Sequence, residues 1–263
     1  MDWGFKDSVA LVTGGNSGIG RSIAVHLAEA GAVVLLVARD PVKGEAVVQE
    51  IAGLGRQSEF FSIDLGDHDA VKALMEDVDG KYGALNVLVN CAGGSERNQG
   101  INEASSVMQR WTQMSGGNFL SAYLVTTYAL PIMRRTGGAV VNVSSTATLH
   151  GNYGLYGAMK SGLEGLTRSM AMECAPLGIR VNAVSPGWVK TAFTAANSDD
   201  PAQITWETTA SLLGRMGSVD EIAMPALFFA SHHASFITGT TLVVDGGMSI
   251  VDATAKNIHA RER

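Results

Sequence analysis

The sequence predicts an α/β fold in which a doubly wound parallel sheet of about seven strands carries helices on both faces. Short apolar, β-branched runs alternate along the chain with longer stretches of helical periodicity. This alternation implies right-handed crossovers and a parallel sheet buried on both sides. The composition agrees, because 46% of the 263 residues are hydrophobic and only 17% are charged.

The elements follow in order from the local patterns. Buried strands are predicted wherever aliphatic and β-branched residues form short runs: Ser8–Thr13, Ala32–Ala38, Glu59–Ile63, Leu85–Asn90, Ala139–Val143, Ile179–Val184 and Thr241–Val244. Helices are predicted over the longer stretches between them: Gly18–Ala30, Val42–Leu54, His68–Tyr82, Ser105–Arg134, Tyr156–Ala175 and Val219–Ala230. No Pro- or Ser-rich linker and no repeat divides the chain, so we expect one domain over 1–263, with 252–263 as a tail or an oligomer contact.

Charge and composition exclude several classes of function. The net charge is −6 and no basic cluster is present, so we expect no nucleic-acid partner. No run approaches the ~20 apolar residues that cross a bilayer, and the first residues carry no secretory signal. Cys91 and Cys174 are the only two cysteines, which indicates reduced thiols rather than a disulfide framework. We therefore expect no membrane partner and a cytoplasmic location.

A glycine-rich turn follows the first predicted strand. The segment TGGNSGIG, 13–20, places Gly14, Gly18 and Gly20 between that strand and the first helix. Gly14 suits a tight turn, Gly18 lets the backbone approach a pyrophosphate, and Gly20 permits close packing of helix on sheet. The helix N-terminus offers free N–H groups to the phosphates. The turn predicts a dinucleotide site.

The end of the second strand bears on the choice of dinucleotide. Arg39 could bind a 2′-phosphate through charge-assisted hydrogen bonds. Asp40 is the competing candidate for a carboxylate that binds the ribose hydroxyls of NAD. We favour NADP(H) over NAD(H), and an NAD-dependent enzyme remains the alternative.

Tyr156 and Lys160 stand four residues apart in YGAMK. On a helix they share a face, so the Lys160 ammonium would lie beside the phenol oxygen. A nearby cation stabilises the phenolate, and lowering its pKa by about three units takes ~4 kcal/mol. The pair predicts an acid/base group that works near neutral pH.

Together these motifs resemble the short-chain dehydrogenase/reductase family. The resemblance spans roughly Lys6 to Gly247 and rests on seven features in order: TGGNSGIG, VNCAGG, Asn118, NVSS, YGAMK, IRVNAVSPG and VVDGG. It implies a Rossmann-type fold and an NADP(H)-dependent ketoreductase or dehydrogenase (EC 1.1.1.-). A small carbonyl compound or secondary alcohol would be the substrate, and hydride would come from the cofactor.

The resemblance also assigns roles to four candidate catalytic residues. Tyr156 would exchange a proton with the substrate oxygen, and Ser145 would hold and polarise that oxygen. Lys160 would lower the pKa of Tyr156 and bind the nicotinamide ribose. The backbone of Asn118 would support a water that relays protons. The family's cofactor contacts would be Gly14, Asn16, Ser17, Gly18, Ile19, Gly20, Arg39, Asp64, Leu65, Asn90, Ala92, Gly93, Tyr156, Lys160, Pro186, Gly187, Val189 and Thr191.

The chain departs from the family pattern at several points. Cys91 stands where Asn is frequent, and we interpret it as a small buried substitute, with a reactive thiol as the alternative. Ser17 stands where many NADP-preferring members carry a second basic residue. Gly116 and Gly117 replace a more usual apolar residue, which is expected to loosen the long helix.

The loop from Ser145 to Tyr156 is shorter than is common. Either its geometry is unusual or Ser144 shares the role of Ser145. We expect the substrate to contact residues of this loop and of the segments that follow the last central strands: Ser145, His150, Tyr153, Trp188 and Phe193. Apolar residues between 192 and 213, with Trp206, Leu212 and Leu213 among them, suggest a lid.

Three functions remain open from the sequence. The first is the NADP-dependent oxidoreductase, the second its NAD-dependent counterpart, and the third a non-catalytic dinucleotide-binding regulatory protein. The apolar circumference of the helix 156–175 also fits a subunit interface. We expect a homotetramer, with a dimer as the alternative.

Overall fold

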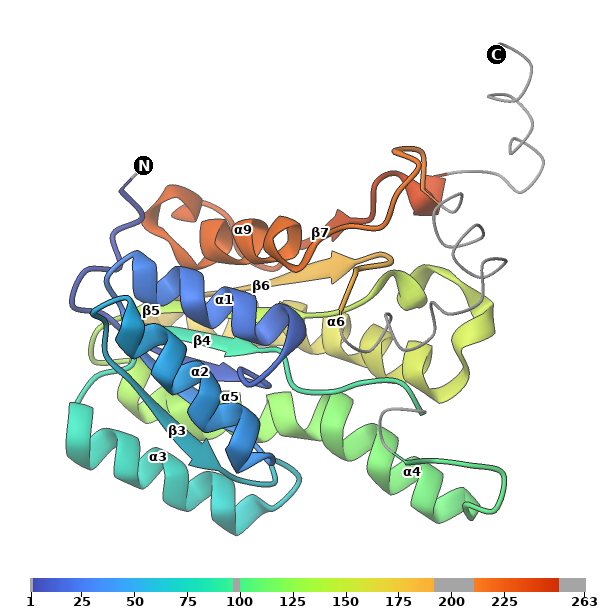
Figure 1. The fold of residues 1–263 in the computed structure, drawn as a ribbon, viewed down its shortest axis with the longest axis horizontal. Helices are drawn as coiled ribbons and strands as arrows, with labels where there is room; N and C mark the ends of the chain where they lie inside the picture. Colours follow the sequence, from blue (N-terminus) through green and yellow to red (C-terminus); the bar gives the residue numbers. More distant parts are fainter. Residues whose placement is uncertain (1, 97–99, 192–210, 251–263) are drawn as a thin grey trace.

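Seven parallel strands form the centre of the molecule. The computed structural model describes residues 2–96, 100–191 and 211–250 (Figure 1). Within them the sheet has the order β3-β2-β1-β4-β5-β6-β7, and every neighbouring pair is parallel. The strands are β1 Val9–Thr13, β2 Val33–Ala38, β3 Ser58–Ser62, β4 Val87–Asn90, β5 Gly138–Val143, β6 Ile179–Pro186 and β7 Thr241–Val244. The predicted doubly wound, Rossmann-type fold of one domain is confirmed.

The direction of winding changes between β1 and β4. The chain builds outward from β1 to β3, then crosses back to place β4 on the other side of β1. The connections that leave the carboxyl ends of β1 and β4 therefore run to helices on opposite faces of the sheet. In open α/β sheets this is the point where ligands bind.

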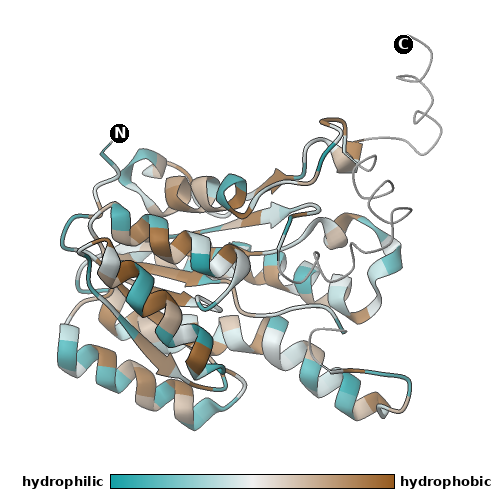
Figure 2. Ribbon diagram, viewed as in Figure 1, coloured by the Kyte–Doolittle hydropathy of each residue, from teal (hydrophilic) through white to brown (hydrophobic). Residues whose placement is uncertain are grey.

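Helices cover both faces of the sheet. They are α1 Gly18–Glu29, α2 Pro41–Gly53, α3 His68–Tyr82, α4 Val107–Ser115, α5 Ser121–Met133, α6 Gly154–Cys174 and α9 Val219–Ala230. Helices α1, α2 and α9 bury Leu27, Ile51 and Ile222 against one face, whereas α3, α5 and α6 bury apolar residues such as Leu74 and Met170 against the other. In Figure 2 the helices carry both hydrophobic and hydrophilic positions, as expected for elements with one buried side.

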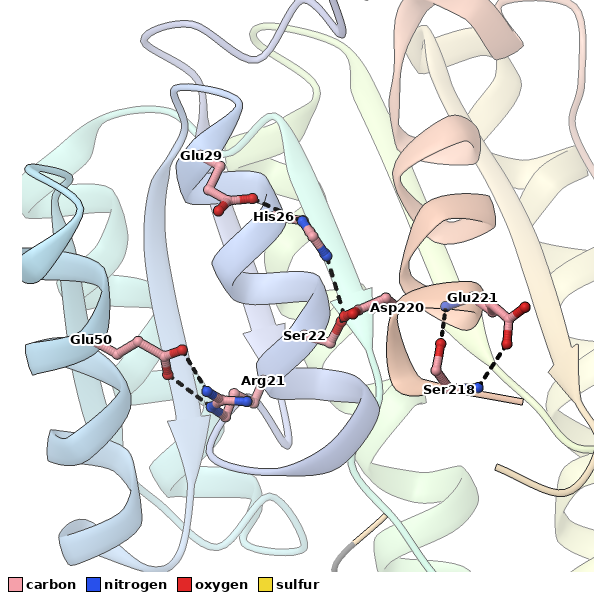
Figure 3. A network of polar contacts seen from close by, with 8 residues as sticks. All are labelled: Arg21, Ser22, His26, Glu29, Glu50, Ser218, Asp220 and Glu221. Carbon is pink, nitrogen blue, oxygen red and sulfur yellow. Dashed lines mark hydrogen bonds and ion pairs between the residues drawn. The ribbon is translucent and has the colours of Figure 1, made fainter. Parts of the chain in front are cut away.

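Polar contacts hold α1 between its neighbours (Figure 3). Arg21 forms a forked ion pair with Glu50 of α2, with its Nε 2.8 Å from Oε2. On the other side, the Ser22 hydroxyl donates to Asp220 of α9 at 2.6 Å, and His26 lies 3.3 Å from the same carboxylate. These contacts fix the helix whose N-terminus follows the glycine turn.

One expectation about the elements was wrong and another needs refinement. The stretch Ser105–Arg134 is helical from Val107 to Met133 as predicted, but Gly116–Leu120 form a π-helical segment between α4 and α5. The outermost strands are also less buried than predicted: β3 is partly exposed, and Leu242 and Val243 of β7 are about 40% exposed. An edge strand has a neighbour on one side only, which explains the difference. Residues 252–263, predicted as a tail, lie outside the described residues.

Candidate active site

A large cleft lies at the carboxyl ends of the strands. Its lining comes from the turn after β1, the ends of β2 and β3, the loop after β4, the start of α6 and the segment after β6. Of the predicted cofactor contacts, all except Asn90 line it. Asn90 is buried, and its amide donates to Thr126 and Asn142, which joins β4 to α5 and β5. Its contribution is to the sheet beneath the cleft.

The glycine turn is shaped by close backbone contacts. Gly14 and Gly18 have φ of +67° and +52°, in the left-handed region that favours glycine. A Cβ on Gly20 would lie 2.3 Å from the carbonyl oxygen of Gly14, so this glycine lets the turn close on itself. The hydroxyl of Thr13 accepts hydrogen bonds from the backbone N–H groups of Cys91 and Ala92, which ties the turn to the loop after β4. The backbone therefore leaves a cradle that side chains would fill.

Asp40 and Arg39 have different surroundings at the end of β2. Asp40 is the N-cap of α2, and its Oδ1 accepts from the backbone N–H of Lys43 at 3.2 Å. The bond to that N–H holds the pKa of Asp40 below its usual value, and the Lys43 ammonium lies 3.5 Å from the other oxygen. The exposed Arg39 lines the cleft, and its guanidinium makes no hydrogen bond or ion pair with the described residues. Of these two residues, Arg39 is the one whose charged group has no partner among the described residues.

Tyr156 and Lys160 meet at the floor of the cleft. Both lie on α6, with the Lys160 Nζ 5.9 Å from the centre of the Tyr156 ring. Lys160 is buried, and its ammonium donates to the carbonyl oxygen of Val143 at 2.8 Å. Burial lowers the pKa of Lys160 to about 8.

The pKa of Tyr156 departs from the expected direction. Burial raises the pKa of the phenol, and the hydrogen bond with Ser145 opposes that rise, while Cys91 and Tyr153 add to it. The expected lowering by Lys160 is therefore absent in this structure. Both groups share one poorly hydrated site, which disfavours the charged form of each.

In the short loop after β5, Ser145 lies beside Tyr156, whereas the hydroxyl of Ser144 is bonded to Glu164. Two 3-10 turns, at Thr146–Leu149 and Gly151–Tyr153, fold the loop. Ser145 lies near enough to Tyr156 to hold down the pKa of its phenol, whereas the buried Ser144 hydroxyl donates to Glu164 at 2.8 Å. Of the two readings of the short loop, the structure favours an unusual loop geometry over a shared serine role.

Asn118 lies in the π-helical segment and is almost fully buried. Its side chain accepts from the N–H of Gly94 at 2.9 Å and donates to the carbonyl oxygen of the same residue at 3.0 Å. A Cβ on Gly93 would come within 2.5 Å of the Asn118 side-chain oxygen. Asn118 thus fixes the loop after β4 where that loop borders the cleft. Such π-helical segments are frequent at functional sites.

The predicted substrate contacts divide into three groups. Tyr153 and Trp188 line the cleft together with Ser145, whereas His150 is not among the lining residues. Phe193 and Trp206 lie outside the described residues. Sequence analysis missed three lining residues: Met108, Trp111 and Leu120. All three are large apolar side chains that remain at least 38% exposed, and only the fold shows that they border the cleft.

Cys91 and the remaining ionisable groups give no sign of a second reactive centre. Burial raises the pKa of the Cys91 thiol to about 11, which favours the structural interpretation over a reactive thiol. No group of three or more His, Cys, Asp or Glu side chains suited to a metal occurs within the described residues. None of the described helices is long and apolar enough to cross a membrane.

Comparison with known proteins identifies the family. The family model described as enoyl-(acyl carrier protein) reductase matches residues 14–249. The chain belongs to the short-chain dehydrogenase/reductase family. This oxidoreductase is 40% identical over 243 residues to 3-oxoacyl-(acyl-carrier-protein) reductase FabG of Staphylococcus aureus, with 91% of this chain and 97% of the relative covered.

Two further proteins of the family are also similar to the chain in sequence or structure. A 3beta-hydroxysteroid dehydrogenase of Mediterraneibacter gnavus is 34% identical over 268 residues, with 93% of this chain and 96% of the relative covered. A solved short-chain type dehydrogenase/reductase from Mycobacterium ulcerans superposes with a TM-score of 0.86 at 33% identity, covering 94% of this chain and 91% of that one. The chain thus belongs to an oxidoreductase family, and the relatives it resembles are named for different substrates.

Proposed function

We propose that the protein is an NADP(H)-dependent oxidoreductase that interconverts a carbonyl compound and a secondary alcohol. The observation that supports this most strongly is the meeting of Ser145, Tyr156 and Lys160 at the floor of a cleft that begins at the glycine turn. The residues of the cleft fit a dinucleotide. The glycine turn offers a backbone cradle, and Arg39 offers a cation that has no partner among the described residues. A bound nicotinamide would supply or accept the hydride.

Tyr156 is the acid/base group in this proposal. In reduction its phenol gives a proton to the substrate oxygen as the carbonyl carbon gains the hydride, and in oxidation the phenolate takes that proton back. Ser145 donates a hydrogen bond to the substrate oxygen, where negative charge develops. Lys160 lies one helical turn further along α6 and, when its amine is protonated, opposes the rise in the Tyr156 pKa that burial causes. Asn118 holds the loop that forms the neighbouring wall.

The choice of NADP over NAD rests on the contrast between Arg39 and Asp40. The Asp40 carboxylate is already engaged as the cap of α2. Arg39 reaches the cleft from the end of β2 with no partner among the described residues. A guanidinium fits a phosphate in a bidentate manner, so Arg39 is the residue that would recognise a 2′-phosphate. Asp40 is poorly placed to serve as the ribose-binding carboxylate of an NAD enzyme.

The substrate class follows from the wall opposite the glycine turn. Met108, Trp111 and Leu120 leave apolar surface at the cleft. We propose a carbonyl carried on an apolar chain or ring, and the names of the relatives supply two probes of this kind. These are an acetoacetyl thioester of N-acetylcysteamine and a 3-oxosteroid.

We also propose that the protein is a homotetramer. Val107 of α4 and Met172 of α6 are large apolar side chains more than 80% exposed, and Tyr123 of α5 is 44% exposed. Of these helices, α6 is the one that sequence analysis assigns to a subunit contact. Exposed apolar surface of this kind is common where subunits meet.

The decisive experiment is a titration of four proteins with NADPH and NADH, followed by nucleotide fluorescence. The proteins are the wild type, Arg39→Ala, Asp40→Ala and a matched control, Arg56→Ala, which removes an arginine outside the cleft. Loss of charge-assisted bonds to the 2′-phosphate predicts a rise of ~10- to 100-fold in the Kd of NADPH for Arg39→Ala. The Kd of NADH should stay within about twofold, because NADH carries no 2′-phosphate.

The other two variants test the alternatives. Asp40→Ala should keep the preference for NADPH, with a small loss in Tm from the missing helix cap. If wild-type protein binds NADH more tightly, and Asp40→Ala abolishes this, the enzyme is NAD-dependent and the proposal is wrong.

A further inference from the structure

Helix α6 carries a third polar residue in register with Tyr156 and Lys160. Glu164 follows Lys160 by four residues, as Lys160 follows Tyr156, so the three side chains share one face of the helix. This face packs against the end of β5. Lys160 donates to the carbonyl of Val143, and the next residue, Ser144, donates its hydroxyl to Glu164 Oε1 at 2.8 Å.

The same carboxylate also binds a second hydroxyl, from a residue that follows Ser145 in the loop. The hydroxyl of Thr148 donates to Glu164 Oε1 at 3.2 Å. Glu164 therefore bonds residues on both sides of Ser145, the serine that faces Tyr156. The backbone of this segment is held elsewhere as well: the N–H of Ser144 donates to Val184 at 2.7 Å, and Ala147 donates to the Ser145 hydroxyl at 3.2 Å.

We propose that Glu164 is a positioning residue that sets the place of Ser145 relative to Tyr156. The inference rests on the proposed function, because it assumes that Ser145 binds the substrate oxygen. Glu164 itself acts only through Ser144 and Thr148. A carboxylate is suited to this task because it accepts two hydroxyl donors at once, and bonds to a charged acceptor are stronger than those between neutral groups.

The position of Ser145 matters more than the stability of its loop. A hydrogen-bond donor in an active site stabilises developing charge only at short distance and in the right direction. A displacement of ~1 Å in such a group can lower the rate by ~100-fold. Loss of the carboxylate should therefore lower kcat while the nucleotide still binds, since the glycine turn and Arg39 lie at the other end of the cleft.

The test compares Glu164→Leu with Glu164→Gln on the full-length protein. Gln keeps an oxygen that can accept from Ser144 and Thr148, whereas Leu keeps the bulk without an acceptor. Steady-state reduction of the acetoacetyl thioester by NADPH gives kcat and KM, and fluorescence titration gives the Kd of NADPH. We expect a ~10- to 100-fold lower kcat in Glu164→Leu, with the Kd of NADPH within about twofold, and a kcat within about threefold of wild type in Glu164→Gln.

Two further variants keep the test independent of folding defects. The double variant Ser144→Ala/Thr148→Val removes both donors and leaves Glu164 in place, so it should reproduce the lower kcat. Glu173→Leu is the matched control: it removes another glutamate of α6, whose partner is the Ser169 hydroxyl at 3.2 Å, and should leave kcat unchanged. Thermal melting of each variant separates loss of folded protein from loss of rate.

The outcomes separate this inference from the proposed function. A wild-type protein that reduces neither the thioester nor the 3-oxosteroid contradicts the proposed function, and the inference with it. An active wild type whose Glu164→Leu and donor-deleted variants match Glu173→Leu in kcat overturns the inference alone. It is also overturned if Glu164→Gln loses as much kcat as Glu164→Leu, because an acceptor would then be insufficient.

Discussion

The two ends of the cleft differ in whether backbone or side chains form their surface. At the end of β1, the surface is mainly backbone: Gly14 and Gly18 adopt positive φ, and Gly20 lets the turn close on itself. Around Tyr156, polar side chains taken out of water form or support the surface: Lys160 of α6 and Asn118 of the π-helical segment are no more than 4% exposed. The first end depends on the absence of side chains, the second on their identity.

This difference has consequences for the effect of substitutions. At the glycine turn a new side chain acts by steric exclusion, and the affinity for the nucleotide changes first. At α6 a substitution changes proton transfer or the cost of burial, and the rate or the stability changes first. The predictions below separate these effects, beginning with the largest.

Tyr156→Phe should have the largest effect, because it removes the proton donor and leaves the ring. We expect kcat for reduction of the thioester to fall by ~10²- to 10⁴-fold, the usual contribution of a general acid. The Kd of NADPH should stay within about twofold. Tyr128→Phe removes a phenol of α5 that bonds His68 outside the cleft; it is the matched control and should keep wild-type kcat. A Tyr156→Phe variant that keeps a tenth or more of wild-type kcat would remove Tyr156 from the acid/base role.

Gly20→Ala should disrupt the glycine turn at the other end of the cleft. Its Cβ would lie 2.3 Å from the Gly14 carbonyl oxygen, so the turn must open. We expect the affinity for NADPH to fall ~10- to 100-fold, as the loss of several backbone bonds to phosphate would give. Fluorescence titration measures the affinity.

Gly53→Ala is the control for this glycine substitution. No heavy atom of the described residues lies within 4 Å of the Cβ it would add at the end of α2. This variant should bind NADPH as wild type does, with unchanged or slightly higher Tm. Equal affinity in Gly20→Ala and Gly53→Ala would mean that the turn does not hold the nucleotide.

The same contrast explains how much could be predicted from the sequence. The glycine spacing, the strand–helix alternation and the Tyr156–Lys160 spacing are local patterns, and they located both ends of the cleft. The ends of most predicted elements agree with the structure within one or two residues; α3, for example, was predicted with its observed bounds. Local patterns are sufficient where backbone geometry or helical spacing dictates the outcome.

Features that depend on packing could not be predicted in this way. The family resemblance assigned Asn90 to the cofactor, but its side chain turns toward Thr126 and Asn142. The π-helical segment between α4 and α5 was not predicted: Gly116 and Gly117 indicated a looser helix, but the helical pattern continues through the segment. The role of Glu164 has no motif, since it requires knowing that α6 packs against the loop after β5.

The smallest free-energy change of the three is expected in the stability of Lys160→Met, a variant that should gain stability while it loses activity. Because the pKa of Lys160 falls from 10.5 to about 8 on folding, the unfolded chain binds more protons between these values. Wild-type stability therefore rises with pH through this window, and below pH 8 the folded state carries the full cost of the buried charge, ~3 kcal/mol. Loss of the bond to the Val143 carbonyl offsets ~1 kcal/mol or more. We expect Lys160→Met to be about 1–2 kcal/mol more stable at pH 7 by urea unfolding, although inactive, with the advantage shrinking from pH 8 to 10.5.

Lys72→Met, at an exposed site of α3, should show no such trend. A stability gain that is absent at pH 7, or equal at pH 7 and 10, would show that Lys160 is not charged at a cost in the folded protein.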